Sequence, residues 1–133
     1  MKTNTIKEAI DRINNGEKVN IAIKEFIDGF FLNQEKHFQA SLIQEEFKLN
    51  EIENHKLICI STVAVVEQVA DIAGIPSPEW CKKEYYYFDE PFFPTKNKEL
   101  QKIYFAEAPI FCRNRNLFCN RLISVFHTKK KKS

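Results

Sequence analysis

The segment from Asn54 to Ile75 constrains the fold most, because it is the most apolar part of the sequence. Its first half, residues 58–63, has the composition of a buried β-strand. The apolar pattern continues as far as Gly74, however, and this length favours a helix over about residues 54–74. Asn54 is the expected N-cap, and Gly74 is the expected end. A helix that is apolar nearly all round needs other helices to cover it, which predicts a central position.

Amphipathic stretches that precede this segment supply covering helices. Residues 5–15, 17–32 and 35–47 each place apolar side chains at helical spacing. Gly16 is expected to end the first of these helices, and Gly29 weakens the second by about 1 kcal/mol relative to alanine.

Residues 76–96 have a different character, with four prolines and seven aromatic residues. Prolines disrupt regular hydrogen bonding, and aromatic rings are costly to leave in water. This connector is therefore expected to lie flat over the bundle. Asn97 is expected to cap a further helix, which carries Leu100, Ile103 and Tyr104. Residues 110–126 are expected to form short helical turns and then a terminal helix, with Asn116 in the left-handed conformation.

These elements predict an all-α fold: a single compact helical bundle around the central helix at about 54–74, with a proline- and aromatic-rich connector. A length of 133 residues fits one hydrophobic core. Glycine and proline together number only eight, which excludes disorder throughout the chain. We expect one helical domain over residues 1–128 and a basic disordered tail over 129–133.

The sequence also predicts a compartment. No apolar run reaches 18 residues, and the first four residues lead into a charged amphipathic segment rather than an apolar signal core. We therefore expect a cytoplasmic protein with no membrane partner. The four cysteines are then expected to be free thiols, with Cys59 in the core.

Motifs for catalysis and for cofactors are absent from the sequence. Three glycines cannot form a glycine-rich phosphate loop, and neither HExxH nor GxSxG occurs. Cys112 and Cys119 are seven residues apart, with His127 eight further on, which is wider than a usual pair of zinc ligands. We predict no metal, no cofactor and no catalytic residues, and His37 and His55 are interpreted as surface histidines, as is His127.

Two carboxylates stand out, because Glu67 and Asp71 lie four residues apart on the apolar central helix. Polar groups there must face water or be paired. One alternative is a salt bridge to Arg113, Arg115 or Arg121, and the other is a binding cleft; we favour the salt bridge. An enzyme is our third hypothesis, and it would require a pocket that is lined by Glu67, Asp71 or Glu90 and that shifts a pKa.

The charge is distributed unevenly. Residues 1–107 carry 13 basic and 18 acidic side chains, whereas residues 108–133 carry seven basic side chains and no acid. The stretch 111–118 interleaves arginine, asparagine and aromatic residues. That mixture suits phosphate contacts with base stacking, and it equally suits packing against the acidic body. The nucleic-acid alternative would use Arg113, Arg115, Arg121, Lys129, Lys130, Lys131 and Lys132, although the lysine run by itself is typical of a solvated terminus.

Three motifs in the second half resemble those of a family of small, largely uncharacterised bacterial proteins. They read G-I-P-x-P-x-W at 74–80, E-P-F-F at 90–93, and A-P-x-F at 108–111 followed by L-F at 117–118. The resemblance covers about residues 57–125. Phe92 stands where the family often has tryptophan, and Cys-Arg-Asn-Arg at 112–115 replaces an arginine pair. Family members occur in toxin–antitoxin-type operons, sometimes beside a nucleotidyltransferase-like protein, so the resemblance implies an antitoxin-like role.

Our leading hypothesis is a non-enzymatic protein-binding module, antitoxin-like, with a protein partner such as an operon-encoded toxin. The absence of a catalytic constellation and the aromatic connector both favour it. We also expect Glu90 and Arg113 to pair and so to tie the connector to the last segment. The predicted partner contacts are Trp80, Tyr86, Glu90, Phe92, Arg113 and Arg115.

Overall fold

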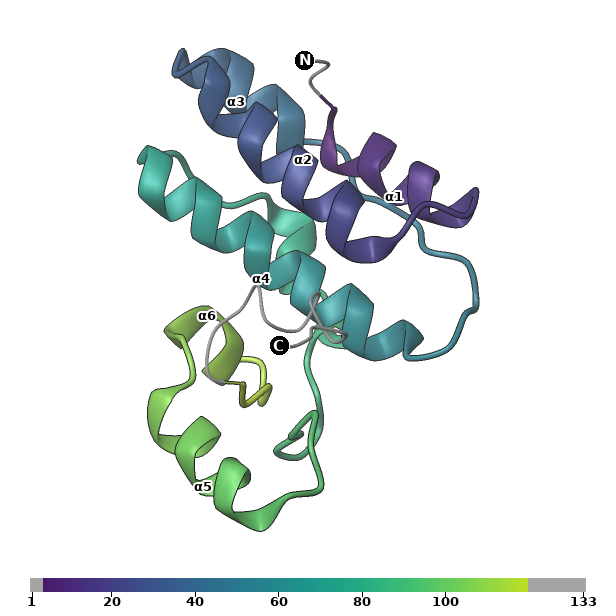
Figure 1. Ribbon diagram of the computed structural model, residues 1–133. Coiled ribbons are helices and arrows are strands. Elements are labelled where there is room, and N and C mark those ends of the chain that lie inside the picture. Colours follow the sequence, from purple (N-terminus) through teal and green to yellow (C-terminus); the bar gives the residue numbers. More distant parts are fainter. Residues whose placement is uncertain (1–3, 120–133) are drawn as a thin grey trace.

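A computed structural model describes residues 4–119 of the chain (Figure 1). Within this range the only β feature is an isolated bridge between Phe92 and Leu117. The prediction of an all-α fold is therefore confirmed, whereas the predicted terminal helix and the tail at 129–133 lie outside the described residues. The elements are α1 (Ile6–Asn14), α2 (Val19–Leu32), α3 (Lys36–Ile43), α4 (His55–Ala73), the short 3₁₀ helices η1 (Glu79–Lys82) and η2 (Glu84–Tyr86), α5 (Lys98–Glu107) and α6 (Ile110–Arg113).

Local sequence signals account for several helix ends. The Thr5 hydroxyl accepts a hydrogen bond from the Glu8 amide, while the Glu8 carboxylate accepts one from the Thr5 amide, which is a capping box. Gly74 ends α4 with a φ of 75°, as predicted. Asn54 is the N-cap residue of α4, as predicted, but it does not cap the helix with its side chain. Its φ is 62° and its side chain makes no cap bond, so it turns the chain into the helix through a left-handed conformation.

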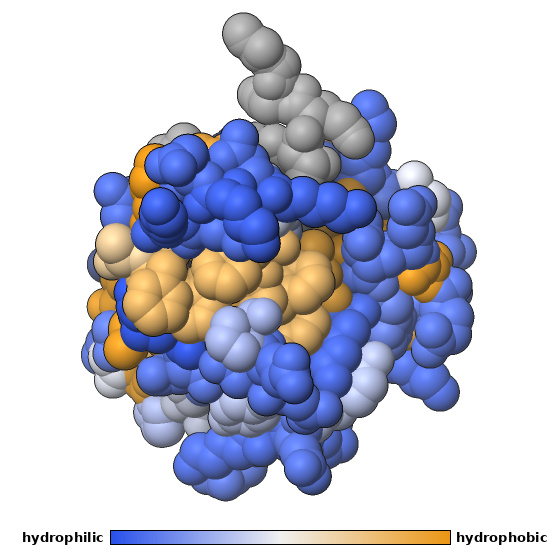
Figure 2. Space-filling view, turned by 90° about the horizontal axis from the view of Figure 1, so that it is seen from below, coloured by the Kyte–Doolittle hydropathy of each residue, from blue (hydrophilic) through white to orange (hydrophobic). Residues whose placement is uncertain are grey.

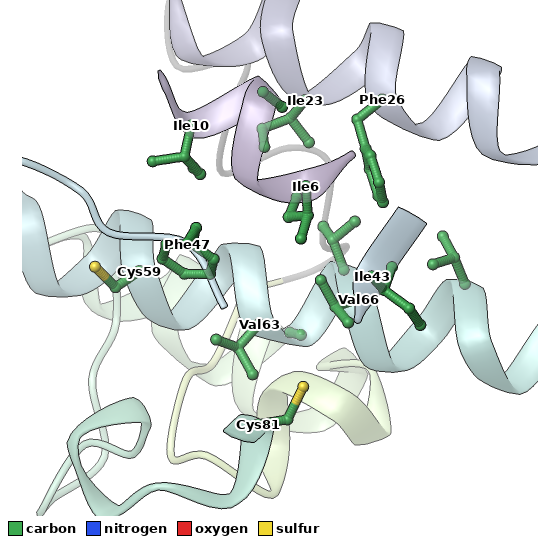
Figure 3. Packing of buried hydrophobic residues seen from close by; sticks show 14 of the residues in the cluster. Ile6, Ile10, Ile23, Phe26, Ile43, Phe47, Cys59, Val63, Val66 and Cys81 are labelled. Atoms are coloured by element: carbon green, nitrogen blue, oxygen red, sulfur yellow. The ribbon is translucent and has the colours of Figure 1, made fainter. Parts of the chain in front are cut away.

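The core is built around α4, which confirms its central position. Every residue of α4 from Cys59 to Val66 is buried. Helices α1, α2 and α3 cover one side of α4, and α6 and the connector lie on the other (Figure 1). Figure 3 shows isoleucine and phenylalanine side chains of α1 and α2 pointing at the valines of α4. Each fully buried side chain of this size contributes about 1.5–3 kcal/mol through the hydrophobic effect.

Helix α3 is shorter than predicted, because it ends at Ile43 and not near residue 47. Phe47 is nevertheless buried, since its ring packs edge-on against the Trp80 ring at a centroid distance of 5.6 Å. Phe47 therefore belongs to a loop that reaches into the core, and not to a further turn of α3.

The lower lobe, residues 76–119, comprises the connector, α5 and α6. The Trp80 indole nitrogen donates to the Gln44 carbonyl at 3.1 Å, which fastens the connector to the loop after α3. The Asn97 side chain accepts from the Leu100 amide and caps α5, as predicted. Helix α5 carries Leu100, Ile103 and Tyr104, as predicted, and none of its ten residues is buried. No helix in the part of the chain that is described has the length and apolar character to cross a membrane.

Candidate functional site

Arg115 is the centre of the lower lobe. Its side chain is 1% exposed, and its guanidinium forms a two-point contact with Glu67, at 2.8 Å and 3.2 Å. It also donates to the Tyr86 carbonyl at 3.0 Å and lies over the Tyr87 ring at 4.4 Å. Of the two alternatives for Glu67, the salt bridge is the one the structure contains. Arg115 is therefore an internal residue, which corrects its prediction as a contact for a partner or for phosphate.

Backbone hydrogen bonds around Arg115 join the connector to the last described segment. The Phe88 amide donates to the Arg115 carbonyl at 3.0 Å, and the Phe92 amide donates to the Asn116 carbonyl at 2.8 Å. Asn116 has a φ of 63°, as predicted, and its side-chain amide donates to the Phe88 carbonyl. These bonds, together with the buried ion pair, hold the two segments in one arrangement.

The predicted pair between Glu90 and Arg113 is wrong, although the expectation that the connector is tied to the last segment is right. Glu90 is exposed, and the Arg113 guanidinium donates instead to the Phe105 carbonyl at 2.8 Å. The tie is made by Arg115, two residues further on. Arg113 is the last residue of α6, whereas Arg115 lies beyond the end of that helix, and the two side chains reach different partners, which the sequence pattern does not reveal.

Three phenylalanine rings and Arg113 form a stack at one side of the lower lobe. Phe118 is buried in the middle, with Phe93 at 5.4 Å and Phe105 at 5.1 Å between ring centroids, each at an interplanar angle of 24°. The Arg113 guanidinium lies 5.8 Å from the Phe105 ring and 5.5 Å from the Phe118 ring. Phe105 remains 55% exposed, so this stack is covered on one side only.

Helix α5 has further exposed apolar side chains, which lie on another face of the helix from Phe105. Leu100 is 38% exposed and Ile103 is 44% exposed. Figure 2 views the molecule from below and shows a broad apolar area framed by hydrophilic residues. We use the name α5 surface for the following residues: Phe93, Leu100, Ile103, Phe105, Arg113 and Phe118.

The predicted contact residues are distributed differently. Tyr86 is buried against Glu46, to which its hydroxyl donates, and Trp80 is partly buried in the packing between connector and loop. Phe92 is half-buried and stacks on Phe88 at 4.5 Å. Arg113 is the one predicted residue that belongs to the α5 surface. The sequence did not predict the remaining members of the α5 surface. One signal was available: on a helical wheel, Phe105 lies on another face from Leu100 and Ile103, so a single packed face cannot bury all three.

A cavity of about 550 Å³ lies between the loop after α3, the start of α4 and η2, and it contains a histidine and a thiol. The nearest atoms to the His55 Nε2 are the Leu49 carbonyl oxygen at 3.0 Å and the Cys59 sulfur at 3.7 Å, and the Tyr85 hydroxyl lies 2.9 Å from Nδ1. A carbonyl oxygen only accepts, so neutral His55 carries its hydrogen on Nε2 and accepts from Tyr85 at Nδ1. Both ring nitrogens are therefore engaged, and His55 is not the simple surface histidine that was expected.

This cavity does not contain an activated nucleophile. Burial, with a smaller contribution from Glu51, raises the pKa of Cys59 to about 12, so the thiol keeps its proton at neutral pH. The carboxylates that an enzyme was expected to use, at positions 67, 71 and 90, do not line it. Residues 4–119 bring together no group of three histidine, cysteine or carboxylate side chains that could hold a metal ion.

Comparison of the chain with protein-family models, with curated proteins and with solved structures finds no match. The resemblance to proteins of toxin–antitoxin-type operons therefore stays a prediction from the three motifs.

Proposed function

We propose that this chain is a non-enzymatic protein-binding module and that it contacts its partner through the α5 surface. The observation that carries the proposal is the exposure of α5, whose ten residues include none that is buried. Leu100, Ile103 and Phe105 each leave apolar side chain in water, and burial against a partner would recover about 25 cal/mol for each Å² covered. Aromatic residues and arginine at the centre of such an area are typical of binding interfaces.

The charge around the α5 surface indicates the chemistry of the partner. Residues 91–119 carry five basic and two acidic side chains, and one of the basic ones, Arg115, is already neutralised by Glu67. Lys96, Lys98 and Lys102 are exposed near the apolar residues. The partner that fits is a protein that presents an apolar surface flanked by carboxylates.

The motif resemblance supports the more specific proposal that this partner is an operon-encoded toxin and that the chain is antitoxin-like. An antitoxin of this kind would cover its toxin by binding, without chemistry of its own. The engaged ring nitrogens of His55 and the protonated thiol of Cys59 are consistent with that role.

Nucleic acid is the alternative partner, and one observation favours it: the exposed Phe105 ring lies beside the Arg113 guanidinium, a combination on which a base can stack. Because Arg115 is internal, this alternative now depends on Arg113 and on residues beyond those described, Arg121 and Lys129–Lys132. It predicts binding that weakens steeply as salt rises.

The test compares two double variants in affinity capture from the native host, with and without nuclease and at two salt concentrations. Leu100→Ser with Ile103→Ser removes apolar groups from the α5 surface. Leu32→Ser with Ile72→Ser removes the same two residue types from α2 and α4, at positions that are each 64% exposed, and serves as the matched control.

We expect one protein, identified by mass spectrometry, to bind the wild type and the control variant, to survive nuclease and high salt, and to be lost with the α5 variant. Binding would then be measured again with the purified partner. Equal capture by both variants would refute the assignment of the α5 surface, and recovery of nucleic acid alone, lost at high salt, would favour the alternative.

A further inference from the structure

Two cysteines of the lower lobe lie in direct contact. The sulfurs of Cys112 and Cys119 are 3.8 Å apart and share an S–H···S hydrogen bond, and both side chains are buried. Cys112 belongs to α6, and Cys119 directly follows the central phenylalanine of the ring stack.

The fold around Arg115 is what brings these sulfurs together. The Arg115 amide and the Leu117 amide both donate to the Cys112 carbonyl, at 2.9 Å and 3.0 Å, and the left-handed Asn116 between them reverses the chain. The backbone turn that positions Arg115 for its ion pair with Glu67 therefore also holds Cys112 and Cys119 next to each other.

The two thiols differ in acidity from each other and from the remaining cysteines. In the neutral pair the Cys119 thiol donates to Cys112; when Cys119 ionises, the Cys112 thiol donates to its thiolate, which lowers the pKa of Cys119, although burial opposes it. The same interaction, together with burial, raises the pKa of Cys112. Burial raises the pKa of Cys59 and that of Cys81 to about 12, so Cys119 is the thiol of this chain that ionises first.

We propose that Cys112 and Cys119 are a redox-active dithiol that a peroxide converts to an intramolecular disulfide. The Cys119 thiolate attacks one oxygen of hydrogen peroxide, the O–O bond breaks, and Cys119 becomes a sulfenic acid while hydroxide leaves. The Cys112 sulfur then attacks the Cys119 sulfur. The S–S bond forms, the S–O bond breaks, and the leaving oxygen departs as water with the proton of Cys112.

Electrons and atoms balance over these two reaction steps. Two thiols lose two electrons, one peroxide gains them, and the hydroxide takes up the proton that Cys119 had released, so that two waters form. The sulfurs must approach from 3.8 Å to about 2.05 Å for the disulfide to form. Peroxide is close to water in size, which suits an oxidant for buried sulfur.

The consequence is a closed ring that spans residues 112–119. This ring contains Arg113 and Phe118, both of the α5 surface, together with Arg115. Oxidation would therefore fix α6 to the ring stack. Any effect on partner binding rests on the proposed function, whereas disulfide formation itself does not.

The purified full-length chain provides the test, since trypsin separates the two cysteines. Cleavage after Lys102, Arg113, Arg115 and Arg121 places Cys112 in one peptide, 103–113, and Cys119 in another, 116–121. Cys59 and Cys81 share a third peptide, 57–82, which is the internal control. After mild peroxide and trapping of free thiols, we expect a disulfide between the first two peptides and two trapped thiols on the third.

Single variants sharpen the test. In Cys112→Ala the resolving thiol is missing, so we expect Cys119 to accumulate as a sulfenic acid that a diketone probe labels. Cys119→Ala should show no such labelling at Cys112. Oxidation of Cys59 or Cys81 before Cys119 would overturn the proposal. So would a disulfide that forms only after the protein is denatured. Conversion of Cys119 to sulfinic acid without a disulfide would also contradict it. The wild-type measurement stands even where a variant folds poorly.

Discussion

The two sides of α4 are held by different forces. On the side of α1–α3, the contact consists of fully buried aliphatic and aromatic side chains, and its strength follows the apolar area removed from water. On the side of the lower lobe, the contact is organised by the guanidinium of Arg115, the carboxylate of Glu67 and a set of backbone hydrogen bonds. Apolar packing on the first side tolerates small shifts of its side chains, whereas the ion pair and hydrogen bonds on the second side require defined distances and angles.

This difference explains where the unusual chemistry of the molecule lies. The lower lobe adds Leu117 and Cys112 to the same core, and directional bonds hold it in place although the apolar residues of α5 stay outside. The α5 surface and the pair of Cys112 and Cys119 are both found there. The contrast between the two sides can be tested by four measurements.

The largest effect is expected from the apolar side. Phe26→Ala removes a fully buried ring between α2 and its neighbours, and should lower the free energy of unfolding by about 3–5 kcal/mol. Chemical denaturation measures it. Leu32→Ala, at an exposed position of the same helix, should change it by less than about 0.5 kcal/mol. Similar losses from both variants would contradict the assignment of the core.

The next effect belongs to the directional side. Glu67→Ala leaves the buried Arg115 guanidinium without its carboxylate, and should cost about 3 kcal/mol. Asp71→Ala, one turn later on the same helix at an exposed position, is the matched control. Hydrogen exchange should show that the amides of Phe88 and Phe92 lose protection while α1 and α2 keep theirs. Uniform loss across the chain would mean that the two sides are one cooperative unit.

A smaller effect, dependent on pH, tests whether the apolar interior continues into the connector. Burial raises the pKa of Cys81, in η1, to about 12 from an ordinary value of 9.0. The folded protein then keeps a proton that the unfolded chain releases, so this contribution is complete below about pH 8 and falls as pH rises from 9 to 12. The loss is about 1 kcal/mol per pH unit for one such thiol. Denaturation at pH 8 to 11 should show a shallower fall for Cys81→Ala than for the wild type, and equal slopes would place Cys81 outside the interior.

The smallest effect is expected at α5. Leu100→Ser with Ile103→Ser changes two side chains that are 38% and 44% exposed, and should alter the free energy of unfolding by less than about 1 kcal/mol. Thermal or chemical denaturation of the free chain measures it. A loss of 2 kcal/mol or more would show that α5 packs as tightly as the helices on the other side of α4.

Sequence reasoning succeeded where the signal is local. The long apolar run predicted the central helix, and Gly74 predicted where it ends. Asn97 predicted the start of α5, and Asn116 was correctly predicted to be left-handed. Each of these features depends on a few neighbouring residues. It failed where the outcome depends on a distant partner. Nothing near Arg115 distinguishes it from Arg113, and the choice between them follows from the path of the chain around Asn116.

The same limit applies to the candidate site. Leu100 and Ile103 have the spacing of a packed helix face, and only the arrangement of the connector and α6 decides that they stay 38% and 44% exposed. Trp80 and Tyr86 are residue types typical of interfaces, yet both are hydrogen-bonded to the loop after α3, at Gln44 and Glu46. Composition predicts which side chains avoid water, and it does not predict whether they do so within the chain or against another one.

The ion pair of Glu67 and Arg115 joins residues that are 48 positions apart, and this separation has a consequence for synthesis on the ribosome. Helices α1 to α4 emerge first and can assemble while Arg115 is still inside the exit tunnel. Until it emerges, one flank of α4 has a carboxylate with no counterion and no lower lobe over it. The nascent chain therefore passes through a stage at which that flank is uncovered, and the stage lasts until Arg115 and the segment around it have left the tunnel.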